Sequence, residues 1–301
     1  MIDTKSTNFN HLKVHTQYSI CEGAIKLEDL KDFCKENKLK SLAICDTTNL
    51  CGALEFAEKI SKVGTQPIIG TQINFKYGDF FGLLPLFALN KQGYQRLIEL
   101  SSQSYLNQNQ LNDPHLDFKQ LLIRNDGLAV FSGTINGFFG QLFKKGKFSE
   151  IEKLYSKLKD EYLDRFYIEI QRHNNQDENG FEKFNLTKSL QIKIPVIATT
   201  EVFYINKDMY EAHDALMCIK NKTYLNDKNR IKFTDQHYLK DNSEMSNLFS
   251  DIPEALENNY NFPYRCNFTP SFSKPILPNI SSEKDGNADE ILKKNSVLGL
   301  N

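Results

Sequence analysis

The chain has 301 residues, of which 40% are hydrophobic and 25% are charged, an ordinary composition for a globular protein. Its 37 basic residues nearly balance 38 acidic ones, and the net charge of −1 gives no support for electrostatic nucleic-acid binding by this chain alone. A chain of this length can bury one large core or two moderate ones.

The six cysteines are scattered and contain no C-x-x-C pair, so no zinc site is indicated and reduced thiols in a cytosolic protein are expected. The N-terminus has no apolar signal segment, and nowhere do 18 apolar residues follow one another. We therefore expect a soluble, cytoplasmic protein that does not bind membranes.

Strand-like apolar runs alternate with amphipathic helical runs along most of the chain. Strands are expected at residues 10–16, 41–46, 67–75, 81–89, 127–133, 166–171 and 194–204. Helices are expected at residues 26–38, 50–64, 91–106, about 137–163, 178–191 and 208–221. The repeated strand-then-helix order favours a parallel sheet, and some seven repeats favour a closed (β/α) barrel, with a doubly wound open sheet as the alternative.

The texture of the sequence changes after residue 268. The next twenty residues hold three prolines and few periodic apolar side chains, which is typical of a linker. A helical pattern begins again at Ala288. We expect one domain over residues 1–268, followed by a separate segment over residues 269–301.

Polar side chains gather just past the ends of the expected strands, where a (β/α) barrel carries its chemistry. They are His15, Glu22, Asp46, Gln72, His173 and Glu201. Imidazoles and carboxylates converging on one mouth are ligands for zinc or manganese, but strand ends are polar in any barrel. His213 lies within an expected helix and is interpreted as a packing or capping residue, whereas His115 and His237 lie in polar stretches without a signal.

Five segments in order resemble the N-terminal PHP (polymerase and histidinol phosphatase) domain of bacterial DNA polymerase III alpha subunits. They are residues 9–30, 42–59, 66–75, 166–174 and 195–219, and the match runs over roughly residues 8–268. The resemblance implies a PHP-type distorted (β/α)7 barrel. It also implies that "LKKNSVLGLN" at the end of the chain is the start of the following polymerase segment, apparently truncated.

Active members of that family hold up to three metal ions at the barrel mouth, and some hydrolyse phosphoesters. Where they carry H-x-H, this sequence has Lys13-Val14-His15, and their T-D-H is Cys45-Asp46-Thr47 here. Their G-x-E ends in Gln72, and their late D-x-H runs from Glu201 to Phe203. The histidine that opens their fourth strand aligns with Leu83. The resemblance thus predicts lost ligands at Lys13, Thr47, Gln72 and Phe203 and a vestigial cluster of His15, Glu22, Asp46, His173 and Glu201.

No bound metal, no cofactor and no catalytic residue are therefore expected in this chain. Alternation along the first strand puts Lys13 on the same face as His15. Lys13 is charged at neutral pH, so we hypothesise that its ammonium replaces the charge of a metal ion and pairs with Glu22, Asp46 or Glu201. The alternative is that Lys13 points into solvent.

Two functions remain open. In the first, the chain is an inactive scaffold in the alpha subunit of DNA polymerase III, a DNA-directed DNA polymerase (a nucleotidyltransferase) of DNA replication. Its implied partners are a proofreading exonuclease subunit, the other polymerase subunits and, through the full-length protein, DNA. Mg²⁺ would serve only the polymerase parent. In the second, the chain is an active phosphoesterase or 3′–5′ exonuclease that uses Zn²⁺ or Mn²⁺.

Overall fold

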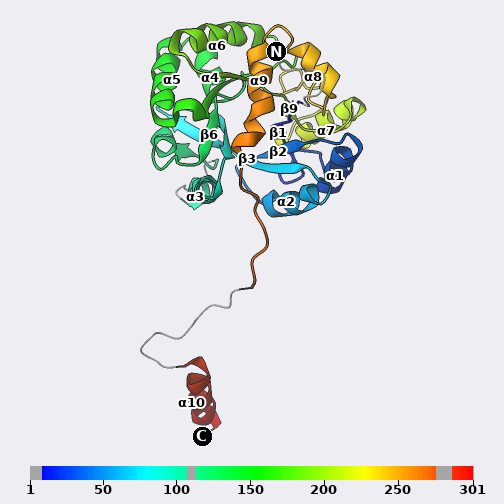
Figure 1. The fold of residues 1–301 in the computed structure, drawn as a ribbon. Helices are drawn as coiled ribbons and strands as arrows, with labels where there is room; N and C mark the ends of the chain where they lie inside the picture. The colour runs from blue at the N-terminus through cyan, green and yellow to red at the C-terminus, as the bar shows by residue number, and fades with distance from the viewer. Residues whose placement is uncertain (1–8, 107–112, 276–286, 301) are drawn as a thin grey trace. The chain divides into compact units, whose positions relative to one another are not determined.

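The computed structural model describes residues 9–106, 113–275 and 287–300, which fall into two compact units, Met1–Pro270 and Ser271–Asn301. The larger unit is the sheet and its surrounding helices (Figure 1). The smaller unit contains the helix expected from Ala288, α10 (Ala288–Leu300). Residues 276–286 of the expected linker lie outside the described residues. Within the described residues, no helix is both long and apolar enough to cross a membrane.

One curled sheet forms the centre of the larger unit (Figure 1). Its strand order is β8-β7-β6-β4-β3-β2-β1-β9, with β5 beside β3. The strands are β1 (Lys13–Val14), β2 (Ser41–Thr47), β3 (Gln66–Tyr77), β4 (Phe80–Ala88), β5 (Leu116–Asp117), β6 (Leu128–Phe131), β7 (Phe166–Ile170), β8 (Val196–Ala198) and β9 (Glu201–Val202). Strands β8 and β9 stand at opposite ends of this path, yet only Thr199 and Thr200 separate them in sequence. The sheet therefore curls until its ends meet, and the expected distorted barrel is confirmed.

The expectation of an all-parallel sheet is wrong at β4, which runs antiparallel to both β3 and β6. The physical reason is the length of the connection. Only Gly78 and Asp79 separate β3 from β4, with Gly78 at a φ of 59°, whereas a parallel crossover needs a dozen residues or more. The single strand expected at 194–204 is likewise two short strands, β8 and β9.

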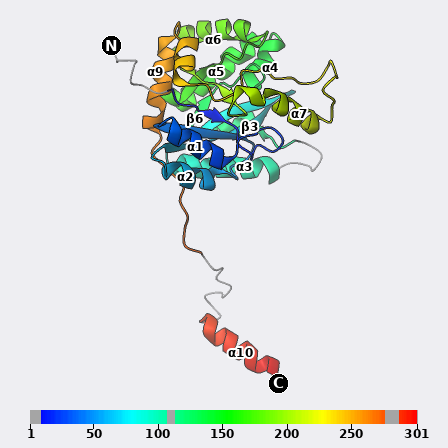
Figure 2. The same cartoon turned by 90° about the vertical axis from the view of Figure 1, so that its right-hand side faces the viewer.

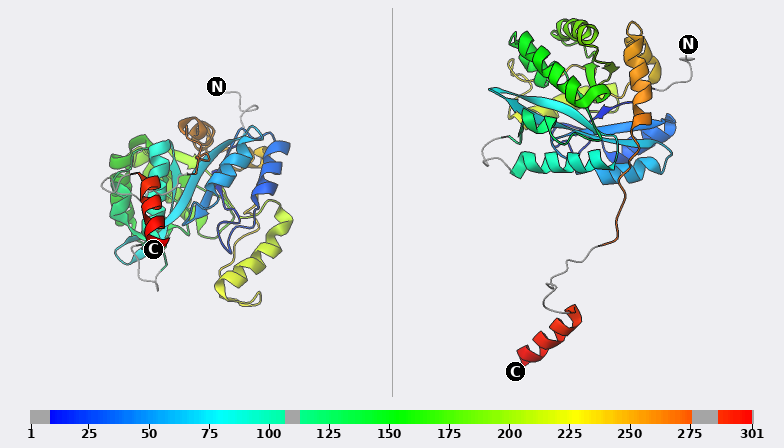
Figure 3. Two further views of the ribbon diagram at one scale, coloured as in Figure 1. Left: turned by 90° about the horizontal axis from the view of Figure 1, so that it is seen from below. Right: turned by 60° about the vertical axis from the view of Figure 1, so that its left-hand side comes forward.

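Helices cover the outer face of the sheet on two sides (Figure 3, right). Helix α2 packs against β3, α3 against β3 and β4, and α9 against β8. The helices of this unit are α1 (Leu27–Glu36), α2 (Ala53–Ser61), α3 (Lys91–Leu106), α4 (Phe138–Lys144), α5 (Phe148–Tyr162), α6 (Glu178–Ile192), α7 (Tyr210–Asn221), α8 (Asn242–Leu248) and α9 (Pro253–Asn261). The helical region expected at 137–163 is two helices, because Gly146 at a φ of 68° ends the first one.

The interior of the barrel changes from apolar to polar along the strands. At one end, side chains from successive strands pack together with Phe262; they include Ala43, Ile68, Phe87, Ala129, Tyr167 and Ile197. Because strand side chains repeat every two residues, Glu169 follows Tyr167 on the same face of β7, and Gln72 follows Ile68 on that of β3. The polar residues thus meet at the opposite end, which is the barrel mouth.

Candidate functional site at the barrel mouth

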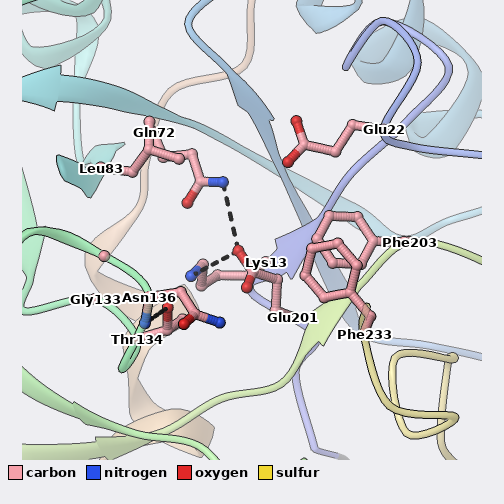
Figure 4. Close-up of a pocket in the computed structure, with 11 residues that line it drawn as sticks. Lys13, Glu22, Gln72, Leu83, Gly133, Thr134, Asn136, Glu201, Phe203 and Phe233 are labelled. Atoms are coloured by element: carbon pink, nitrogen blue, oxygen red, sulfur yellow. Dashed lines mark hydrogen bonds and ion pairs between the residues drawn. The ribbon is translucent and has the colours of Figure 1, made fainter. Parts of the chain in front are cut away.

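A cavity of about 80 Å³ opens at the polar end of the barrel. Figure 4 shows Lys13 and Glu201 at its centre, with Gln72 and Leu83 on one side and Phe203 and Phe233 on the other. The side chains come from β1, β9, β3 and β4 and from the segments that follow β9, so residues far apart in sequence are brought together.

Lys13 is fully buried, which excludes the alternative that it points into solvent. Its Nζ lies 3.2 Å from Oε1 of Glu201 and 3.7 Å from Oε1 of Glu169. The pairing with Glu201 follows from the register, since Lys13 and Glu201 are direct partners across the parallel strands β1 and β9. Burial would lower the pKa of Lys13, but the two carboxylates outweigh it and raise that pKa above its ordinary value. Lys13 is therefore an ammonium at neutral pH.

Glu201 is the centre of a small polar network. Its Oε1 lies 3.2 Å from Nε2 of His15 and accepts a hydrogen bond of 3.4 Å from Nε2 of Gln72. Burial alone would raise the pKa of Glu201, but the charge of Lys13 and the contact with His15 hold it well below its usual range. Phe203, at a predicted lost-ligand position, stacks on the His15 ring with the centroids 4.6 Å apart.

His173 is close to this network, but its ring nitrogens are engaged with other groups. Nε2 accepts a hydrogen bond of 3.1 Å from the backbone N–H of Glu201 and lies 3.1 Å from Oγ1 of Thr200. Nδ1 lies 3.2 Å from Oε1 of Glu178. His237 stacks on His173 at a centroid distance of 4.1 Å. Burial, with the neighbouring His173, holds the pKa of His237 well below its ordinary value.

Of the three carboxylates considered as partners of Lys13, Asp46 and Glu22 pair with other groups. Asp46 accepts three hydrogen bonds from the loop after β1, from the N–H and Oγ1 of Thr16 at 2.7 and 2.8 Å and from Oγ of Ser19 at 2.7 Å. Glu22 pairs with Lys220 at 3.4 Å. Both carboxylates thus hold loops in place.

His213 has the packing role expected of it, because its buried ring in α7 lies 2.9 Å from the backbone oxygen of Glu22. Thr47 lies at the end of β2, where its Oγ1 accepts a hydrogen bond of 3.3 Å from Gln72.

Glu169 and His237 are among the residues of the site that were not predicted. Glu169 lies between Ile168 and Ile170 in a fully buried strand. A carboxylate in the middle of such an apolar strand could have indicated from the sequence that Glu169 belongs to the site. His237 lies in a stretch without regular periodicity and was interpreted as a polar loop residue, yet its ring is buried. No pattern in the sequence around His237 indicates its burial.

These side chains do not suit a divalent metal ion. A metal site needs several donors with free lone pairs, but Nε2 of His173 already accepts a backbone hydrogen bond and Nε2 of His15 faces Glu201. The ammonium of Lys13 would repel a cation next to Glu201. Among the described residues, no group of three or more His, Cys, Asp and Glu side chains is placed to hold an ion. That no metal binds in solution stays a prediction.

A model of the PHP domain family matches residues 11–173, more than half of the chain. The chain belongs to the PHP domain family. It is similar to curated proteins named DNA polymerase III subunit alpha, at 33% identity to that of Caulobacter vibrioides over 100% of this chain and 27% of the relative. For the Vibrio cholerae protein the identity is 34%, over 90% of this chain and 24% of the relative. The chain spans about a quarter of the length of these relatives.

The solved structures to which the chain is similar are more distant in sequence. One is titled a putative metal-dependent phosphoesterase from Bifidobacterium adolescentis, with a TM-score of 0.43, 13% identity and coverage of 64% of this chain and 86% of that chain. Another is a two-domain protein from Bacteroides vulgatus that contains a predicted PHP-like metal-dependent phosphoesterase, with a TM-score of 0.40, 12% identity and coverage of 81% and 63%.

Proposed function

We propose that this PHP domain is part of a DNA polymerase III alpha subunit and serves there as a catalytically inactive scaffold. The observation that carries the proposal is the buried ion pair of Lys13 with Glu201 at 3.2 Å, at the mouth where active members of the family bind metal. The names and coverage of the curated relatives support the polymerase context.

The chemistry of hydrolysis explains why this pair argues against an active site. A hydrolytic metal lowers the pKa of a bound water toward 7 and needs protein ligands together with an open position. Lys13 places a positive charge beside Glu201, but an ammonium, unlike a metal ion, has no coordination position at which to bind and activate a water. It can hold the carboxylates in place but cannot generate a nucleophile, so the residues of the barrel mouth are proposed to have structural roles only.

The scaffold has proposed partners. A proofreading exonuclease subunit would dock on the barrel domain of residues 1–268, and the other polymerase subunits and DNA would be contacted through the full-length protein in the cytoplasm. Residues 269–301 would be a linker and the start of the next segment. Nucleotide addition, with its Mg²⁺, would lie in sequence beyond this chain.

Metal titration tests the proposal. Zn²⁺ and Mn²⁺ are titrated into the purified chain by calorimetry, and bound metal is counted after dialysis. We expect no stoichiometric binding by the native chain. As a matched comparison, a Lys13→His, Gln72→Glu and Phe203→His variant restores three of the lost ligands and should bind at least one ion. Two or three ions bound tightly by the native chain would instead support the active phosphoesterase or exonuclease.

A further inference from the structure

The net charge of −1 conceals a strong local asymmetry. Residues 220–232, here called the basic arm, contain five cations and a single acid, Asp227. Because the whole chain carries −1 and the arm +4, the remaining residues together carry −5. The arm begins in the last turn of α7, at the edge of the larger unit (Figures 2 and 3). The near-zero total therefore does not exclude a local site for a polyanion.

Two of the five cations tie the arm to the body of the domain. Arg230 makes a two-pronged ion pair with Asp214 of α7, with one N–O distance of 2.6 Å, and its Nε donates to the backbone oxygen of Leu225. Lys220 pairs with Glu22 of the loop after β1. These contacts anchor the arm at Lys220 and Arg230, which lowers the cost of ordering it around a ligand.

The other three cations, Lys222, Lys228 and Lys232, are exposed. Within the described ranges, no acidic side chain lies within ion-pair distance of any of them. Lys232 instead lies over the Tyr210 ring, 5.9 Å from its centroid. Three exposed ammonium groups on an anchored segment are available to a partner with several negative charges.

An aromatic residue lies among these cations in the sequence. Tyr224 is 76% exposed, and its backbone is held in a turn, since its N–H donates to Oδ2 of Asp227 at 2.8 Å and the N–H of Asp227 donates back to its oxygen at 3.0 Å. Leu225 beside it is 58% exposed. An exposed ring on an ordered turn, close in sequence to lysines, offers a surface on which an unpaired base can stack while the phosphates contact the cations.

We propose that the basic arm binds single-stranded nucleic acid, with Lys222, Lys228 and Lys232 contacting phosphates and Tyr224 stacking on a base. A folded acidic protein would use the lysines but would not need the exposed ring. The proposal goes beyond the scaffold function, because none of these four side chains lines the barrel mouth.

Fluorescence anisotropy tests it, with a fluorescein-labelled oligothymidylate of about 20 nucleotides titrated with the full 301-residue chain at about 50 and 200 mM salt. The test variant is K222Q/K228Q/K232Q. Each phosphate contact contributes about 0.7 to the salt dependence of single-strand binding, so three contacts contribute about 2. The affinity advantage of the native chain over this variant should therefore shrink about 20-fold between the two salt concentrations.

The matched control is K35Q/K38Q/K40Q, which also removes three exposed lysines. Each set includes one lysine with a left-handed backbone, Lys38 at a φ of 50° and Lys222 at 53°. The control variant should bind like the native chain. Tyr224→Ala should weaken binding about 5- to 150-fold without changing the salt dependence, because stacking involves no counterion release. Circular dichroism verifies that each variant is folded.

Several results would overturn the proposal. They are no binding of the oligothymidylate by the native chain at the lower salt, an unchanged affinity and salt dependence in the arm variant, or an equal loss in the control variant. Equally tight binding of polyglutamate, together with no effect of Tyr224→Ala, would assign the arm to an acidic polypeptide instead. None of these outcomes depends on the metal titration, so the two proposals fail separately.

Discussion

Replacing Lys13 with methionine removes a charge and keeps the length of the side chain. In the native barrel the ammonium lies 3.2 and 3.7 Å from two buried carboxylates, those of Glu201 and Glu169. Breaking a buried pair by removing one partner leaves an uncompensated charge and costs about 3–5 kcal/mol. We therefore expect Lys13→Met to lower the free energy of unfolding by about 3–5 kcal/mol at pH 7, a large part of the stability of an ordinary domain.

The pH dependence gives this prediction a signature that a packing defect lacks. The pKa of Glu201 is depressed, so its contribution to stability is present above its ordinary value of 4.5 and is lost as the pH falls through the folded-state pKa. The pKa of Lys13 is raised, so its contribution is lost only as the pH rises above 10.5. Without Lys13, the carboxylates take up protons more readily, and the deficit of the variant should shrink as the pH falls from 7 toward 4.5.

Urea denaturation followed by far-UV circular dichroism measures these differences. The double variant Lys13→Met/Glu201→Gln should recover part of the loss, because one buried charge is removed with its partner. Lys35→Met, at an exposed lysine, serves as the control and should stay within about 0.5 kcal/mol of the native chain. A Lys13→Met variant as stable as the native chain, or a double variant no more stable than the single one, would refute the reasoning.

Three further predictions concern stability. Burial lowers the pKa of His11 to about 4 from its ordinary 6.5, so the contribution of His11 to the free energy of unfolding is lost as the pH falls through this window. In urea titrations, the His11→Gln variant should therefore lose about 2 kcal/mol less stability between pH 7 and pH 5 than the native chain does. A variant that loses as much stability over this pH range as the native chain would contradict the prediction. Gly93→Ala would place a Cβ 1.9 Å from the Gly127 oxygen and should cost about 2 kcal/mol, whereas Gly180→Ala has no atom nearer than 3.7 Å and should gain up to about 1 kcal/mol by thermal unfolding. Equal changes in melting temperature in the two glycine variants would exclude the predicted clash at Gly93. Asp241→Ala removes the capping box that begins α8 and should cost about 1 kcal/mol in the same assay, while no change in melting temperature would mean that the cap contributes nothing.

Local patterns predicted most of the elements correctly. The helix expected at 91–106 is α3 with the same bounds, as its periodic apolar residues indicate. The antiparallel direction of β4 could also have been predicted from the sequence, because the connection from β3 is too short for a parallel crossover. Helices α8 and α9 were missed although Asp241 and Glu244 form a capping box and Pro253 stands at the start of α9.

The site was predicted less completely, because its pairs depend on strand register. Alternation placed Lys13 on the same face as His15, but the choice among Glu22, Asp46 and Glu201 is made by the pairing of β1 with β9. No local pattern reports the alignment of strands so distant in sequence. Whether Glu169 faces inward depends in the same way on the direction in which the sheet curls, and the burial of His237 depends on a segment without periodicity.

The position of β1 has a consequence for the order in which the protein is made. His15 meets Glu201 only across 186 positions of sequence, and β1 pairs with β9 along one of its two sides. At typical synthesis rates, β9 follows β1 from the ribosome after about 10–40 s. During that interval β1 has an open edge whose backbone groups could pair with another chain, and a lysine on such an edge discourages that pairing. Lys13 thus discourages wrong strand pairing while the sheet is incomplete, and it balances the charge of Glu201 once the sheet is complete.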